Sequence, residues 1–71
     1  MENQNLNLYY IFYITAGCGN ISLAAKELFI SQPAISKAIS KLETNLGCVL
    51  FTRNSRGVKL TSEGEVLYKQ L

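Results

Sequence analysis

The sequence predicts a mainly α fold with one β hairpin, and three observations support this fold class. Apolar residues recur every three or four positions in three successive segments, which is the spacing of one helix face. About three residues separate the second segment from the third, so these two helices must cross steeply. A short alternating segment with turn residues follows, and then another helix start. This is the order of a winged helix-turn-helix: a three-helix core, a two-stranded β wing and the start of a C-terminal linker helix.

The first helix is predicted over residues 6–16, where its inner positions are Leu8, Ile11, Phe12 and Thr15. The Tyr and β-branched residues of this segment would also suit a strand. Gly17 supplies a stop. The second helix starts at Ser22, a suitable N-cap for the chain from Leu23 onward. Its inner stripe consists of Ala24, Ala25 and Leu28.

The third helix, predicted over residues 32–46, has the clearest pattern. Its apolar stripe covers roughly 60° of arc and consists of Ile35, Ile39, Leu42 and Leu46. Ser31 is a suitable N-cap, and Gly47 is the glycine expected after the last turn. The outward face is small, polar and basic without an acid, and comprises Pro33, Lys37, Ser40, Lys41 and Thr44, with Gln32 and Ser36 at its side.

A hairpin is predicted over residues 49–60, with strands at 49–53 and 58–60 and turn residues at 54–57. Arg56 lies at its tip. We expect Arg53 either to pair with Glu43, which would tie the hairpin to the third helix, or to contact a phosphate. Thr61 then caps a further helix, whose early acidic residues suit the positive end of a helix dipole.

Length and composition exclude several classes of protein. Seventy-one residues form at most one domain, too small for a barrel enzyme or a doubly wound nucleotide-binding fold. Histidine is absent and the two cysteines lie far apart, so we expect no metal, no cofactor and no catalytic site. The cysteines fit ordinary thiols of a reducing cytoplasm, although one disulfide is formally compatible. The longest apolar run has seven residues, and the first residues lack the basic flank of a signal peptide, so we expect a cytoplasmic protein without a membrane partner.

Charge is concentrated in the middle of the chain. The formal net charge of +2 is a weak argument for nucleic acid. Residues 31–60, however, carry a net charge of +4 from Lys37, Lys41, Arg53, Arg56 and Lys59 against Glu43. This segment could form a phosphate-facing surface, or it could be an ordinary solvated face.

Three motifs in order resemble a known family. They are Ser-Gln-Pro-Ala-x-Ser-Lys at 31–37, Leu-Glu-x-x-Leu-Gly at 42–47 and Leu-Phe-x-Arg at 50–53. Together with Ala24-Ala25 and Leu60-Thr61, they resemble the N-terminal DNA-binding domain of LysR-type transcriptional regulators over about residues 6–68. The chain departs from that pattern at Asn20-Ile21, where the family usually carries Ser-Phe, and at Gly17-Cys18, where acids are frequent.

The resemblance implies sequence-specific binding of double-stranded DNA at an operator or promoter. Helix 32–46 would enter the major groove, with its contacts from Gln32, Pro33, Ser36, Lys37 and Lys41. Such side chains can read base edges or bind phosphates. Arg56 matches the wing-tip arginine, which suits the minor groove. Ser22 and Ser31 would reach phosphates or only cap helices, and Arg53 completes the predicted set.

The resemblance also implies a domain plan. Residues 1–60 form the DNA-binding domain, with the helix-turn-helix at 21–40 and the wing at 49–60, and residues 61–71 begin a linker and dimerisation helix. We expect a fragment of a longer, nucleoid-associated regulator rather than a stand-alone remnant of one. Such a regulator is a homodimer or tetramer and binds a small-molecule effector only through a C-terminal domain that is missing here. This fragment alone is expected to be a monomer or weak dimer. The alternative is a protein-interaction winged helix, whose third helix should present an apolar face instead.

Overall fold

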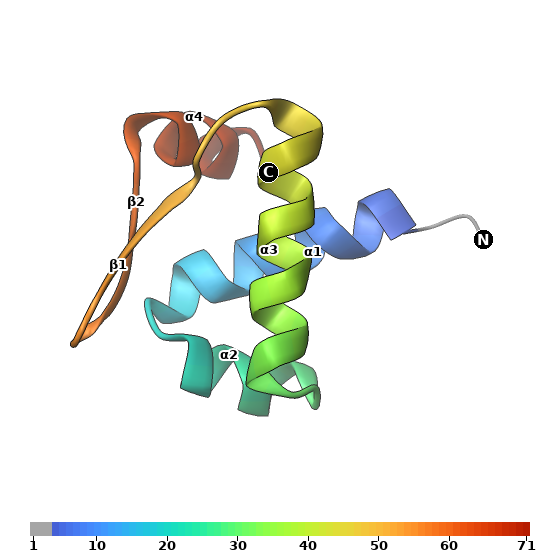
Figure 1. Cartoon of the computed structure of the whole chain (residues 1–71), viewed down its shortest axis with the longest axis vertical. Helices are drawn as coiled ribbons and strands as arrows, with labels where there is room; N and C mark the ends of the chain where they lie inside the picture. Colours follow the sequence, from blue (N-terminus) through green and yellow to red (C-terminus); the bar gives the residue numbers. More distant parts are fainter. Residues whose placement is uncertain (1–3) are drawn as a thin grey trace.

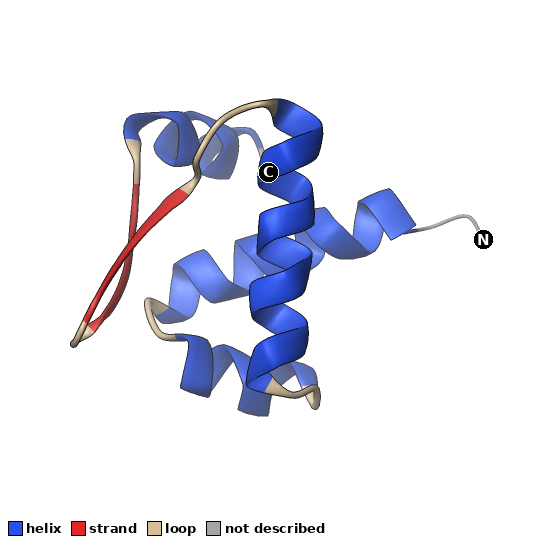
Figure 2. Ribbon diagram, viewed as in Figure 1, coloured by secondary structure: helices blue, strands red, loops and turns tan. Residues whose placement is uncertain are grey.

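The computed structural model describes the backbone of residues 4–71 and the side chains of residues 8–71. Within this range the chain forms four helices and one antiparallel hairpin (Figures 1 and 2). Residues 1–3, at the start of the predicted domain 1–60, lie outside the described residues. The elements are α1 (Gln4–Cys18), α2 (Ile21–Leu28), α3 (Gln32–Leu46), β1 (Phe51–Asn54), β2 (Gly57–Leu60) and α4 (Ser62–Gln70). The predicted order of elements is confirmed.

The first segment is a helix rather than a strand, and it runs two residues beyond its predicted end. Gly17 lies inside α1, so its assignment as the stop is wrong. The chain instead turns at Gly19, which has φ +68 and whose N–H donates to the carbonyl of Thr15 at 2.9 Å. This conformation suits glycine, because a Cβ would be strained there.

The start of α2 also differs from the prediction. Asn20 is the N-cap, with its Oδ1 accepting a hydrogen bond from the N–H of Leu23 at 3.0 Å. Ser22 lies within α2, so its assignment as the cap is wrong. The reason is the position of the preceding turn: Asn20 follows Gly19 directly, in the extended conformation that a capping residue requires.

The third helix has the predicted bounds and caps. Oγ of Ser31 accepts from the N–H of Ala34 at 3.2 Å, and Gly47 ends the helix with φ +73. Ile35, Ile39 and Leu42 are buried as predicted. Leu46 is 41% exposed, so its place in the buried stripe is wrong. Figure 1 shows why: the last turn of α3 extends beyond α1 and α2, against which the rest of the stripe packs.

The core includes the base of the wing as well as the three helices. Side chains of α1, α3 and the segment leading into β1 are fully buried, among them Phe12, Ile35, Ile39, Leu42 and Leu50. The rings of Phe12 and Phe51 lie 5.3 Å apart between centroids, at an interplanar angle of 48°. The wing is therefore fixed to the helical core at its base, while its tip projects to one side of the helices (Figure 1).

The hairpin has a shorter turn than predicted. Phe51 pairs with Leu60, and Asn54 pairs with Gly57, which leaves only Ser55 and Arg56 between the strands. The first strand begins at Phe51, so its predicted start at residue 49 is wrong. Val49 and Leu50 instead bond to Thr61: its N–H donates to the carbonyl of Leu50 at 3.0 Å, and its Oγ1 donates to the carbonyl of Val49 at 2.6 Å. Thr61 also caps α4, as predicted.

Candidate nucleic-acid interface

The outward face of α3 carries most of the predicted contact residues. Gln32, Pro33, Lys37 and Lys41 are exposed, and Ser36 is half-buried. At ~100° per residue, Gln32 and Ser36 share one edge of the helix, Pro33 and Lys37 occupy its outermost face, and Lys41 lies about 180° around from Gln32. The third helix thus presents a polar surface in which the first two turns offer several hydrogen-bonding groups side by side.

A groove lies between the wing tip and the N-terminal ends of α2 and α3. It is lined by Ser22 from α2, Gln32 from α3, and Arg53 and Arg56 from the wing. The fold therefore brings together four predicted contact residues from three separate elements. The others are not part of this groove: Ser31, Pro33, Ser36, Lys37 and Lys41 lie along α3 or at its cap.

Arg53 connects the wing to the third helix, but not through the predicted partner. Its Nη1 donates to Oγ of Ser36 at 3.3 Å. The expected pair with Glu43 is wrong, because Oε2 of Glu43 instead accepts from the N–H groups of Leu50 at 2.8 Å and Phe51 at 3.4 Å. These two backbone donors lie at the base of the wing. In the sequence they are closer to Glu43 than Arg53 is.

This arrangement makes the surface around the groove basic. The cationic residues of the segment 31–60 are all exposed, namely Lys37, Lys41, Arg53, Arg56 and Lys59. Glu43, the acid of that segment, is half-buried and bound to backbone N–H groups. Its negative charge is therefore directed into the base of the wing, and the outer surface keeps the positive charge that polyanions attract.

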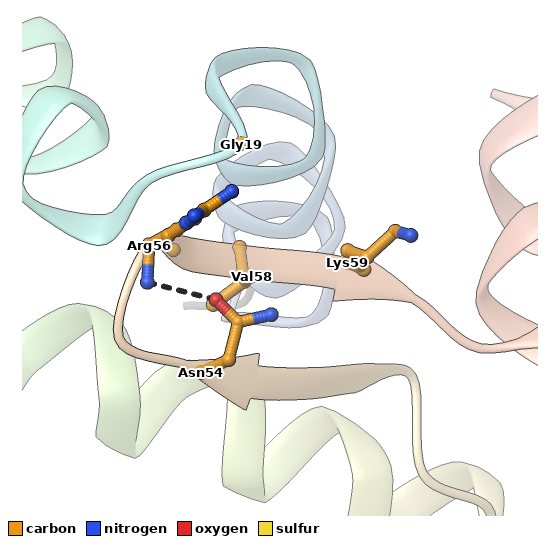
Figure 3. Close-up of a pocket in the computed structure, with 6 residues that line it drawn as sticks. Gly19, Asn54, Arg56, Val58 and Lys59 are labelled. Carbon is orange, nitrogen blue, oxygen red and sulfur yellow. Dashed lines mark hydrogen bonds between the residues drawn. The ribbon is translucent and has the colours of Figure 1, made fainter.

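The wing tip is held by a contact that the sequence analysis missed. Oδ1 of Asn54 accepts a hydrogen bond from the N–H of Arg56 at 2.8 Å, as Figure 3 shows. Gly19 lies above β2 in the same view, and its carbonyl accepts from the N–H of Val58 at 3.2 Å. A signal for the first contact is present in the chain: Asn two residues before a backbone donor is a recurrent turn pattern.

Asn20 was missed for a different reason. Asn20 and Ser22 both belong to the residue types that cap helices, so residue type does not choose between them. The structure shows Asn20 as the cap and as part of the groove lining.

The described residues show no sign of a metal centre or of a membrane span. Among the described residues, no group of three or more His, Cys, Asp or Glu side chains could hold a metal ion. Cys18 and Cys48 are free thiols, both half-buried. In residues 4–71, no helix is long and apolar enough to cross a membrane.

Comparison with known proteins gives one consistent result. Residues 6–65 match the family model described as bacterial regulatory helix-turn-helix protein, lysR family. The chain is 53% identical over 53 residues to the HTH-type transcriptional regulator ClcR of Pseudomonas putida, covering 75% of this chain and 18% of that protein. It is 37% identical over all 71 residues to the probable HTH-type transcriptional regulator SinR of Salmonella typhimurium, covering 22% of that protein. The chain thus spans about a fifth of the length of these relatives.

Solved structures show the same similarity. The crystal structure of the CbnR_DBD–DNA complex superimposes with a TM-score of 0.87 at 38% sequence identity, covering 90% of this chain and 74% of that one. At this identity the likeness extends to sequence as well as fold.

Proposed function

The chain belongs to the LysR family of bacterial regulatory helix-turn-helix proteins, and we propose that it binds double-stranded DNA in a sequence-specific manner. The observation that carries the proposal is the basic groove in which α2, α3 and the wing each contribute polar side chains. A related domain of known structure is bound to DNA, which supports the same role here.

We assign α3 to the major groove. Gln32 can form two hydrogen bonds with adenine, and Lys37 can donate to guanine or to a phosphate. Both are exposed in the first two turns of the helix. The side chains of Pro33 and Ser36 are short, so they allow the helix to approach the bases closely. Each bidentate contact would contribute about 1–3 kcal/mol of discrimination between bases.

We assign phosphate contacts to the residues around this helix. Ser22 is exposed in the first turn of α2 and is not engaged as a cap, so its hydroxyl can donate to a phosphate. Ser31 caps α3 through its oxygen and keeps its hydroxyl proton for the same purpose. Lys41 and Arg53 would supply charge on either side of the base-reading face.

We assign Arg56 to the minor groove beside the site. It is exposed at the end of a projecting hairpin and lines the groove that α3 also borders. Arginine is drawn into narrow, A·T-rich minor grooves by their negative potential. The wing would therefore read the shape of flanking DNA while α3 reads the bases.

The role of the whole protein follows from its relatives and is part of the proposal. We infer a transcription regulator rather than an enzyme, acting on the chromosome in the bacterial cytoplasm as a homodimer or tetramer. Residues 1–60 form its DNA-binding domain and residues 61–71 the start of a linker and dimerisation helix. An effector would bind outside this domain, in the part of the longer relatives that this chain does not span.

Selection of binding sites from a random pool of duplexes, at a fixed salt concentration, tests this function. A recovered consensus and an affinity that falls steeply with salt would support it. Recovery of no consensus would contradict sequence-specific binding and favour a protein-interaction role for this winged helix.

A further inference from the structure

We propose that Asn54 is a positioning residue for Arg56: with the carbonyl of Gly19, it holds the wing tip in its DNA-binding geometry before DNA arrives. This inference rests on the proposed DNA-binding function. The inference is based on the backbone conformation of the wing turn and on the hydrogen bonds that hold this turn.

The wing turn does not have the conformation that a two-residue hairpin usually adopts. Among the described residues, Phe29 is the only non-glycine residue with positive φ, so Ser55 and Arg56 both have negative φ. The turns whose twist matches two short strands require positive φ at one or both central positions. The sequence from Asn54 to Gly57 instead has the Asn and Gly preferences of a type I turn. Such a turn needs other contacts to keep the strands in place.

Two contacts supply that restraint. Within the turn, the side chain of Asn54 accepts from the N–H of Arg56 at 2.8 Å, which fixes the backbone that carries the Arg56 side chain. Beyond the turn, the N–H of Val58 donates to the carbonyl of Gly19 at 3.2 Å. Gly57 has φ +146, and a Cβ there would collide with the same carbonyl oxygen, so this close approach requires glycine. Strand β2 is thus held against the turn between α1 and α2 (Figure 3).

These contacts matter for binding because an isolated hairpin of two four-residue strands is only marginally stable. Arg56 lines two grooves at the wing tip, and it shares one of them with Ser22 and Gln32, so a small movement of the turn moves it relative to these two residues. Ordering a loop at the moment of binding lowers affinity. A tip that is already ordered avoids that loss, and Asn54 acts through Arg56 rather than by touching DNA itself.

A double-mutant cycle on Asn54 and Arg56 tests the inference. The probe is a duplex recovered by site selection with the 71-residue chain, flanked by A·T-rich sequence. We expect Asn54→Ala to weaken binding about two- to tenfold, which is the range expected for ordering one long side chain on binding. In the Arg56→Ala background, the same change should have no further effect. Asn54→Ser, whose hydroxyl can accept from the same N–H, should restore part of the affinity.

Ser55→Ala is the matched control, because it removes a polar group from the same turn and leaves the Asn54 contact intact. A loss for Asn54→Ala that is absent in Ser55→Ala and vanishes without Arg56 supports the inference. An unchanged affinity, or a loss that persists in the Arg56→Ala background, overturns it. If the wild-type chain selects no duplex at all, that result contradicts the proposed DNA binding itself, and it is distinct from the outcomes above.

Discussion

Replacing Glu43 with Ala tests how the wing is fastened to the third helix. Oε2 of Glu43 accepts from the backbone N–H of Leu50 at 2.8 Å and of Phe51 at 3.4 Å. Both of these residues are buried, so truncation of Glu43 leaves two N–H groups without that acceptor in a place that water reaches poorly. The change should therefore destabilise the whole domain rather than loosen the wing tip alone.

The two hydrogen bonds of Glu43 determine how much stability Glu43→Ala should lose. A hydrogen bond to a charged group contributes about 1.5–3 kcal/mol, and here one bond is short and the other long. We expect Glu43→Ala to lower the free energy of unfolding by about 2–3 kcal/mol. At ~0.05–0.15 kcal/mol per residue, the entire domain has only about 4–10 kcal/mol of stability. The melting temperature should fall by roughly 10–20 °C.

Urea unfolding followed by circular dichroism measures this loss. The control is Glu27→Ala, which removes an exposed acid from α2 and should change stability by less than about 0.5 kcal/mol. Arg53→Ala should also have little effect, because Arg53 bonds to Ser36. If Glu43→Ala unfolds at the same urea concentration as Glu27→Ala, or if Glu43 and Arg53 show strong coupling, the assigned role of Glu43 is refuted.

Three further predictions follow from the core, the wing and α4. Leu42→Ala should destabilise the domain by about 2–5 kcal/mol, because Leu42 is 1% exposed at the centre of the buried stripe; an unchanged urea midpoint would contradict this. Arg56→Ala should weaken binding more on A·T-rich than on G·C-rich flanks and leave the melting temperature nearly unchanged; equal losses would exclude minor-groove insertion. Sedimentation at micromolar concentration should show a monomer or weak dimer, because α4 has only nine residues and its Tyr68 packs within its own domain. The ring of Tyr68 stacks on that of Tyr13, with 5.0 Å between the ring centroids. A tight dimer would instead place the interface elsewhere, for example on α1, where Tyr10 is 58% exposed.

Most features that depend on neighbouring residues were predictable from the sequence, although the end of α1 and the cap of α2 were predicted wrongly. The bounds of α3 follow from the spacing of Ile35, Ile39 and Leu42 and from the caps at Ser31 and Gly47, all of which act within a few positions. The order of the elements follows in the same way, because each helix or hairpin has its own start and stop signals.

Features that depend on distant residues were not predictable in the same way. The stripe of α3 includes Leu46 by spacing, but spacing does not show where the packing partners of that helix end. Glu43 could accept from any donor near the wing. Only the folded structure shows that its partners are backbone N–H groups and not the Arg53 side chain. The groove itself joins residues from α2, α3 and the wing, so no local pattern describes it.

Site selection repeated with Gln32→Ala and Lys37→Ala tests the central claim most directly. Each variant should lose preference at one position of the selected site, corresponding to about 1–3 kcal/mol, and keep the remaining positions. The control is Lys69→Ala, which removes an exposed lysine from α4, a helix that lines neither groove at the wing, and should recover the wild-type consensus. Identical consensus sequences from the wild type and both α3 variants would contradict the assignment of α3 as the base-reading helix.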